Sequence, residues 1–453
     1  MTTDRLSRRE FIAASAGIAA LAWSPGHLRG RATKPNLLVI LADDLGYGDL
    51  SAFGRPDYRT PNIDSLVSDG VRFTNAYAAA STCTPTRVAF MTGRYPQRLS
   101  HELQRPMGWG TREAGPPKYG LSPSHPTLPA LLKRAGYRTA LVGKWHLGFM
   151  PEFGPNRHGF DEFFGIHGGG ADYFTHTGPR GQRDLWENDV PVERVGYLTE
   201  LLSERAADFI RRRHDRPFYL SLHYTAPHWP WEGPQDHHGA EPKHHFVDGG
   251  SRPVFAQMVR SLDDGVGRVL AALKRAGLER DTLVVFTSDN GGERFSYNWP
   301  WSDGKFTLWE GGIRVPLAMR WPGQLPRAAA TDQLAISMDW AATLLAAAGA
   351  PADPAYPLDG VDLLPFARGD RTAAARALFW RQPYPDQTPH AAARRDRWKY
   401  LRVGDQEYLF DVAVDSGEKA NLKTQRADAF ERLREEWRAW DAQMVPLPKP
   451  AER

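Results

Sequence analysis

Four separate places in the sequence combine side chains that can bind a metal ion or transfer a proton. Each place lies at, or a few residues after, the end of a short apolar run: 37–42, 139–143, 218–222 and 282–287. The side chains are Asp43 and Asp44, Lys144 and His146, His223 and His228, and Asp289 and Asn290. A single Asp after a strand usually forms a turn or a helix cap, so one such residue indicates little. Their recurrence at four strand ends indicates a common site.

The apolar runs are typical of strands buried on both faces, and the segments between them have helical periodicity. The predicted helices cover 62–69, 127–135, 198–213 and 253–276. This alternation predicts an α/β fold with a large, mostly parallel sheet covered by helices on both faces. Ligands bind such sheets outside the carboxyl ends of the strands. The fold would therefore bring all eight side chains into one crevice.

Oxygen ligands dominate the candidate metal site. Asp43, Asp44, Asp289 and Asn290 offer carboxylate and amide oxygens, which suit calcium or magnesium better than zinc. Lys144 is a cation close to this site, which makes sense if an anion lies between the metal and the ammonium group.

The single cysteine has no partner for an internal disulfide. It opens the segment Cys83-Thr84-Pro85-Thr86-Arg87, which Thr92-Gly93 follows. Pro85 favours the first turn of a helix and Gly93 its end. Cys83 is therefore expected at a helix N-terminus, where backbone N–H groups favour an anion, with Arg87 one turn further on the same face. The alternative is a structural cysteine packed as a small hydrophobic residue.

The Cys83-x-Pro85-x-Arg87 segment with Thr92-Gly93 resembles the signature of the type I sulfatases of the alkaline phosphatase superfamily, in which this cysteine is oxidised to Cα-formylglycine. The general pattern looks closer to the arylsulfatase and N-acetylgalactosamine-6-sulfatase type than to the shorter members. Other segments resemble those of the family and follow in the same order. They are 43–48, 143–148, 226–228, 287–291, and 304–305 with 309–316. The resemblance runs from about residue 36 to 411, nearly the whole chain after its N-terminal segment.

The resemblance implies a set of roles for individual residues. The formylglycine hydrate made from Cys83 would bind one Ca²⁺ together with Asp43, Asp44, Asp289 and Asn290. Arg87 would hold the hydrate, and Lys144 and Lys305 would bind the sulfate group. His228 would protonate the leaving oxygen, and His146 would be the base that eliminates sulfate.

This implied activity is hydrolysis of sulfate monoesters in a sulfated sugar or an aryl sulfate. A phosphonate or phosphate-diester hydrolase of the same superfamily is the enzyme alternative. A non-catalytic protein that binds sulfated glycans, with Cys83 left as a thiol, is the alternative from another class.

The N-terminus resembles a bacterial twin-arginine signal, because Arg8-Arg9-Glu10-Phe11 precedes a short apolar stretch over 13–22. Residues 1–32 are thus expected to be a signal peptide and linker, and the protein to be periplasmic or secreted. A formylglycine-generating enzyme would have to act before export.

The later sequence contains no apolar run long enough for a membrane span. The net charge of +4 is dispersed, so no nucleic-acid partner is expected.

Two domains are expected after the signal: a catalytic α/β domain over 33–365 and a C-terminal α+β subdomain over 366–453. The latter should contain short antiparallel strands at 378–380, 398–402 and 407–411 and a helix over 426–444.

Three other groups of residues have open interpretations. Trp299 and Trp301 either line the pocket or pack internally; His237, His238, His244 and His245 are expected in a solvated loop; Asp263 and Asp264 are expected as a surface or first-turn pair.

Overall fold

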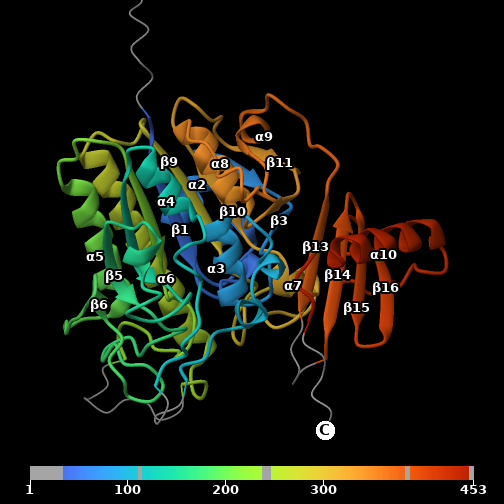
Figure 1. Ribbon diagram of the computed structural model, residues 1–453, viewed down its shortest axis with the longest axis horizontal. Helices are drawn as coiled ribbons and strands as arrows, with labels where there is room; N and C mark the ends of the chain where they lie inside the picture. The colour runs from blue at the N-terminus through green and yellow to red at the C-terminus, as the bar shows by residue number, and fades with distance from the viewer. Residues whose placement is uncertain (1–33, 111–114, 237–245, 383–387, 448–453) are drawn as a thin grey trace, which may run out of the picture. The chain divides into compact units, whose positions relative to one another are not determined.

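The computed structural model describes residues 34–110, 115–236, 246–382 and 388–447 (Figure 1). Residues from Pro35 onward form one compact unit. The signal-peptide prediction and the four histidines between 237 and 245 lie outside the described residues. None of the helices in the described ranges is long and apolar enough to cross a membrane.

A ten-stranded mixed sheet forms the larger part of this unit, in the order β11-β2-β10-β9-β1-β8-β4-β5-β6-β7. Its strands are β1 (Asn36–Ala42), β2 (Val71–Phe73), β4 (Arg138–Lys144), β5 (Glu162–Ile166), β6 (Trp186–Glu187), β7 (Val190–Pro191), β8 (Phe218–His223), β9 (Thr282–Ser288), β10 (Leu317–Arg320) and β11 (Ala329–Thr331). The central strands β9, β1, β8, β4 and β5 run parallel to their neighbours in this order, and antiparallel strands lie towards the edges. The predicted sheet, mostly parallel at its centre, is confirmed.

Helices cover both faces of this sheet, as predicted. They are α2 (Pro61–Ser68), α3 (Cys83–Thr92), α4 (Leu128–Arg134), α5 (Leu198–Arg211), α6 (Arg252–Arg275), α8 (Asp339–Ala348) and α9 (Leu364–Arg368). The short α7 (Glu310–Ile313) instead contributes Ile313 to a core that it shares with the C-terminal strands. Alternate residues of β1 explain the two layers: Leu38 and Ile40 pack in a core with α2, α5 and α6, and Leu37 and Val39 pack in a second core with α3, α4 and α8.

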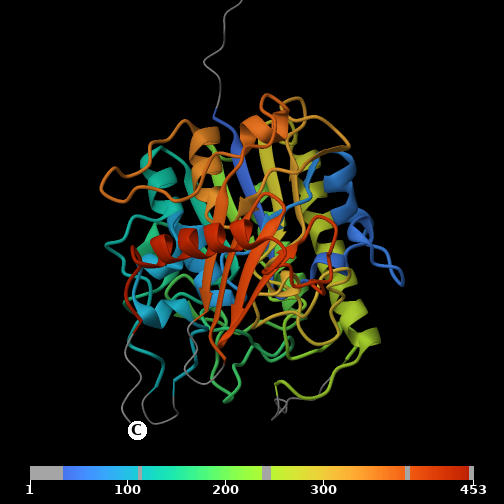
Figure 2. The same cartoon turned by 90° about the vertical axis from the view of Figure 1, so that its right-hand side faces the viewer.

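A smaller antiparallel sheet follows, in the order β13-β14-β15-β16. Its strands are β13 (Ala377–Gln382), β14 (His390–Arg395), β15 (Trp398–Val403) and β16 (Gln406–Asp411), and α10 (Ala427–Asp441) lies across it (Figure 2). Trp437 and Trp440 of α10 pack in a core with this sheet. A two-stranded sheet of β3 (Ala76–Tyr77) and β12 (Ala335–Ile336) completes the described strands. The predicted C-terminal sheet and helix are confirmed; the boundary at residue 366 stays a prediction.

Asp263 corrects one sequence prediction. It lies in the middle of α6 and is buried, so it belongs to neither the surface nor the first turn. Its carboxylate accepts hydrogen bonds from Asn62 N at 3.2 Å and Ile63 N at 2.7 Å, which caps the N-terminus of α2. Asp264, the next residue, is exposed.

Candidate active site

The order of the central strands brings the predicted site residues together. β1 lies between β8 and β9, and β4 follows β8, all with parallel pairing. Ala42 is in register with Ser288, so Asp43 and Asp289 leave the same edge of the sheet from adjacent strands. Asp44 and His146 have positive φ values of 61° and 57°, which are rare for residues other than glycine and often occur at functional sites.

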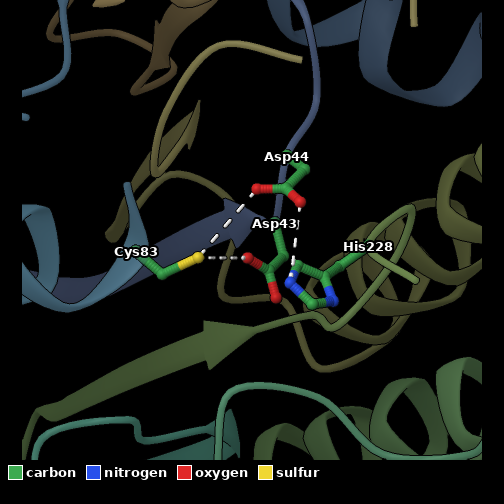
Figure 3. A group of neighbouring side chains, drawn as sticks. All are labelled: Asp43, Asp44, Cys83 and His228. Atoms are coloured by element: carbon green, nitrogen blue, oxygen red, sulfur yellow. Dashed lines mark hydrogen bonds and ion pairs between the residues drawn. The ribbon is translucent and has the colours of Figure 1, made fainter. Parts of the chain in front are cut away.

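Carboxylates and the cysteine form the centre of this site. Asp43, Asp44, Cys83 and His228 point towards one another, and each offers a ligand atom within 4.8 Å of the others (Figure 3). Asp289 and Asn290 adjoin this group: Asp44 N donates to Asp289 Oδ1 at 3.2 Å, and Asn290 Nδ2 donates to Asp44 Oδ1 at 2.8 Å. The predicted oxygen ligands therefore occupy one buried position beside the thiol.

Two observations show that these residues fit a divalent cation. Asn290 Oδ1 is buried and has no hydrogen-bond partner in the described part of the chain. Burial and the neighbouring Asp289 raise the pKa of Asp43 to about 8, although Lys144 and Arg87 oppose this shift. A cation among these oxygens would satisfy the amide oxygen and stabilise the ionised carboxylates, and an all-oxygen protein set suits Ca²⁺.

Cys83 is the first residue of α3, as predicted, and Gly93 ends that helix with φ 68°. The Cys83 Sγ lies 3.4 Å from Asp43 Oδ1 and 3.9 Å from Asp44 Oδ1. Burial, reinforced by the Asp289 and Asp43 carboxylates, raises the pKa of the thiol well above its usual value. An unmodified Cys83 is therefore a neutral thiol and a weak nucleophile.

Arg87 is fully buried and fixes the geometry behind the cysteine. It donates through Nε and Nη2 to Asp289 Oδ2, at 3.1 and 2.9 Å, and through Nη1 to the Lys144 carbonyl oxygen at 3.0 Å. His223 also contacts Arg87 Nη1, at 3.2 Å from its Nδ1, and lies at the end of β8. His223 thus supports Arg87. Of the other seven side chains predicted at the strand ends, six lie around the cysteine or contact its neighbours, and the His146 ring contacts the Met107 carbonyl oxygen.

Two buried lysines approach the carboxylates from different directions. Lys144 Nζ lies 2.6 Å from Asp43 Oδ2, and Lys305 Nζ lies 2.6 Å from Asp44 Oδ2. Burial alone would lower the pKa of Lys305, but Asp44 and other nearby acidic groups outweigh it and raise this pKa well above its usual value. Lys305 is therefore a permanent cation that can bind an anionic substrate.

Backbone carbonyl groups orient the two histidines. His146 Nε2 lies 2.9 Å from the Met107 oxygen and His228 Nδ1 lies 2.6 Å from the Trp229 oxygen, so each of these nitrogens donates its proton. His146 Nδ1 is buried and has no hydrogen-bond partner among the described residues, and His228 Nε2 lies 3.6 Å from Asp44 Oδ2. Burial and the nearby lysines lower the pKa of both rings well below the usual value.

A glycine run that the sequence analysis did not single out lies against both histidines. A Cβ on Gly169 would come within 2.8 Å of His146 Nε2, and one on Gly170 within 3.1 Å of His228 Cε1. Any side chain here would displace an imidazole ring. Three consecutive glycines, Gly168-Gly169-Gly170, are conspicuous in the sequence. No neighbouring residue in the sequence indicates, however, that they contact the two histidines.

The sequence analysis did not identify Asp49 or Glu293 as candidate site residues. The buried Asp49 carboxylate accepts hydrogen bonds from Gly46 N and Tyr297 N, both at 2.8 Å, and from Ser296 Oγ at 2.5 Å. It joins the loop that follows Asp44 to the loop that precedes Lys305. Glu293 Oε2 lies 3.3 Å from Lys305 Nζ.

The two tryptophans have different environments. The Trp301 ring packs 3.8 Å from the Arg314 guanidinium, which supports the packing interpretation for this residue. Trp299 is 63% exposed and stacks on Tyr297.

Contacts from the small sheet reach the residues beside the cysteine and Lys305. Gln382, at the end of β13, accepts a hydrogen bond from the Ser81 hydroxyl and donates one to the Phe306 carbonyl oxygen. The C-terminal sheet therefore helps to fix both segments.

Comparison with known proteins identifies the family. The sequence model of the sulfatase family matches residues 35–350, and that of the C-terminal region of N-sulphoglucosamine sulphohydrolase matches residues 297–441. The chain therefore belongs to the sulfatase family. This result confirms the resemblance to type I sulfatases of the alkaline phosphatase superfamily.

Individual relatives agree with this assignment. N-acetylgalactosamine-6-sulfatase from Rattus norvegicus is 36% identical over an alignment of 359 positions, and the match covers 74% of this chain and 66% of the relative, about two thirds of that protein. Arylsulfatase A from Bos taurus is 33% identical over an alignment of 471 positions, and the match covers 91% of this chain and 85% of the relative. The structure of Ps i-CgsB in complex with k-i-k-neocarrahexaose has a TM-score of 0.81 and 31% identity, and the match covers 91% of this chain and 94% of that one.

Proposed function

We propose that this protein is a sulfatase that hydrolyses sulfate monoesters of sugars or aryl alcohols, using formylglycine made from Cys83 and a bound Ca²⁺ ion. The observation that supports this proposal is the position of Cys83. Its sulfur lies within 4 Å of two buried carboxylates, in a site that also holds two lysines and two histidines. A protein that only binds sulfated glycans would not need all of these side chains.

Asp43, Asp44, Asp289 and Asn290, together with residue 83, would hold the calcium ion. When bound, Ca²⁺ supplies positive charge for the sulfate oxygens, and formylglycine as its hydrate supplies one hydroxyl that attacks sulfur and a second that permits release of sulfate. Arg87 would orient the hydrate, because its guanidinium is fixed by Asp289 and by the Lys144 carbonyl.

Lys144 and Lys305 would bind the sulfate group. Their ammonium groups are buried, so their attraction for charge that develops on sulfate oxygens is stronger than in water. Each lies 2.6 Å from a carboxylate of the proposed metal site, and this supports the expectation that both would contact the substrate anion.

The two histidines would transfer protons through specific nitrogens. His146 holds its proton on Nε2, so its buried Nδ1 atom carries the free lone pair and can act as the base. His228 holds a proton on Nδ1, so donation from Nε2 to the leaving oxygen requires the imidazolium form. The lowered pKa of His228 limits this form to acidic solution.

Export by the twin-arginine route, with modification of Cys83 before transport, completes the proposal. It rests on the sequence of residues 7–22 alone. Because Cys83 is buried in the folded protein, the modifying enzyme would have to act on the nascent chain, before folding and export.

Parallel assays of phenyl sulfate and a phenyl phosphonate monoester test the proposed reaction. The purified protein should release sulfate with the higher kcat/KM. A higher kcat/KM for the phosphonate would assign the chain to the alternative hydrolase class, and Cys83→Ala should abolish turnover of either ester.

A further inference from the structure

Lys305 and His228 converge on one oxygen at one side of the site. Lys305 Nζ lies 2.6 Å and His228 Nε2 lies 3.6 Å from Asp44 Oδ2. If the proposed function is correct, this is the side on which the leaving alcohol accepts its proton. Groups next to Lys305 and His228 therefore face the part of the substrate that adjoins the ester oxygen.

Glu293 lies next to Lys305 and is more exposed than Lys305. Its Oε2 lies 3.3 Å from Lys305 Nζ, and its side chain is 25% exposed, against 3% for Lys305 and 3% for Asp44. The loop that carries it is anchored, because Lys305 N donates to the Gly292 carbonyl oxygen at 3.1 Å. The carboxylate is thus held beside Lys305 and partly exposed, rather than free on the surface.

A partly exposed carboxylate beside an anion-binding lysine can discriminate between substrates. One oxygen contacts Lys305, and an ionised carboxylate has further lone pairs that accept hydrogen bonds from hydroxyl groups. The same charge repels a second anionic group beside the ester, and such repulsion is an effective means of excluding wrong partners.

We propose that Glu293 determines specificity at the leaving-group side of the site. It accepts a hydrogen bond from a hydroxyl adjacent to the sulfate ester and excludes esters that carry a second anion there. The preferred substrates are then sulfate esters of neutral, hydroxylated alcohols, such as a monosulfated sugar, rather than polysulfated or carboxylated ones. This inference rests on the proposed sulfatase function.

Three aryl sulfates that differ only beside the ester test this proposal: phenyl sulfate, 2-hydroxyphenyl sulfate and 2-carboxyphenyl sulfate. Sulfate release gives kcat/KM for each with the wild type, Glu293→Gln and Glu293→Asp. The value for each substituted ester is divided by that for phenyl sulfate. Comparing this ratio between variants cancels the intrinsic reactivity of each ester and any general loss of activity.

Glu293→Gln should lower the relative kcat/KM of the hydroxyl ester and raise that of the carboxyl ester, each by about tenfold or more. Glu293→Asp, which keeps the charge, should retain the wild-type order. The matched control is Glu204→Gln, an exposed acid on α5, which should change neither ratio.

Unchanged ratios in Glu293→Gln, with sulfate still released, would overturn this inference and leave the sulfatase proposal intact. Absence of sulfate release by the wild type from all three esters would overturn both.

Discussion

Arg87 donates two hydrogen bonds to one oxygen of Asp289, and both side chains are fully buried. Lysine cannot reproduce this paired geometry. Arg87→Lys keeps the positive charge but loses this paired geometry, so it should lower the free energy of unfolding by about 1.5–3 kcal/mol, the usual contribution of a hydrogen bond to a charged group, and nearly abolish activity. Denaturant unfolding and kcat/KM measure the two effects. Arg327→Lys, at an exposed pair with Asp69, is the control and should be neutral; equal effects in both variants would contradict the role of Arg87.

Calcium should stabilise the fold, because its proposed ligands converge only in the native state. At a calcium concentration 100 times Kd, the stabilisation is about 2.7 kcal/mol. Chelation should lower Tm, and Asn290→Ala should weaken calcium binding in isothermal titration. Greater stabilisation by magnesium than by calcium would contradict the choice of cation. An unchanged Tm after chelation would contradict the metal site itself.

Activity should depend on pH with a maximum on the acidic side. The pKa values of His146 and His228 are both lowered from 6.5 by burial and neighbouring lysines. The base must be neutral, so activity rises as His146 loses its proton; the acid must be protonated, so activity falls as His228 loses its proton. Both limbs should lie below about pH 6.5. A profile of kcat/KM against pH with phenyl sulfate checks this, and a maximum in alkaline solution would rule out the assigned roles.

Asp49 should matter to both stability and catalysis, because it connects the loops on either side of the proposed metal. In Asp49→Asn, an NH₂ group would replace an oxygen that faces the Gly46 N–H and the Ser296 hydroxyl. An unsatisfied buried group of this kind costs about 1–3 kcal/mol of stability. Calcium affinity and kcat/KM should fall as well.

Asp57→Asn is the matched control for Asp49→Asn. Asp49 and Asp57 both pair with Arg55, but the Asp57 side chain is 56% exposed, so its loss should be almost neutral. Equal changes in calcium affinity in the two variants would show that Asp49 does not hold the loops together.

The sequence predicted the central strands well, because continuous apolar runs specify burial on both faces. The observed β1 and β9 match the predicted runs to within one residue at each end. By contrast, β14 was missed. Its sequence His-Ala-Ala-Ala-Arg-Arg has no β-branched residue, and it is a strand because β13 and β15 pair with it on both sides and α10 packs on the sheet.

Some residues in and around the site could be predicted from the sequence, and others could not. Residues at the ends of strong strands, such as Asp43 and Asp289, were predictable because parallel strands present them at one edge. Asp49 and Asp263 were not, since their partners lie far away along the chain: Ser296 is 247 positions from Asp49, and Ile63 is 200 positions from Asp263. Only the folded structure places these pairs in contact.

The chemical state of residue 83 tests the central claim most directly. The full chain should be co-expressed with a formylglycine-generating enzyme, and the peptide that contains position 83 analysed by mass spectrometry alongside the sulfatase assay. We expect the mass of formylglycine at this position, and activity in proportion to the converted fraction. An active preparation in which Cys83 is found only as unmodified cysteine would contradict the account.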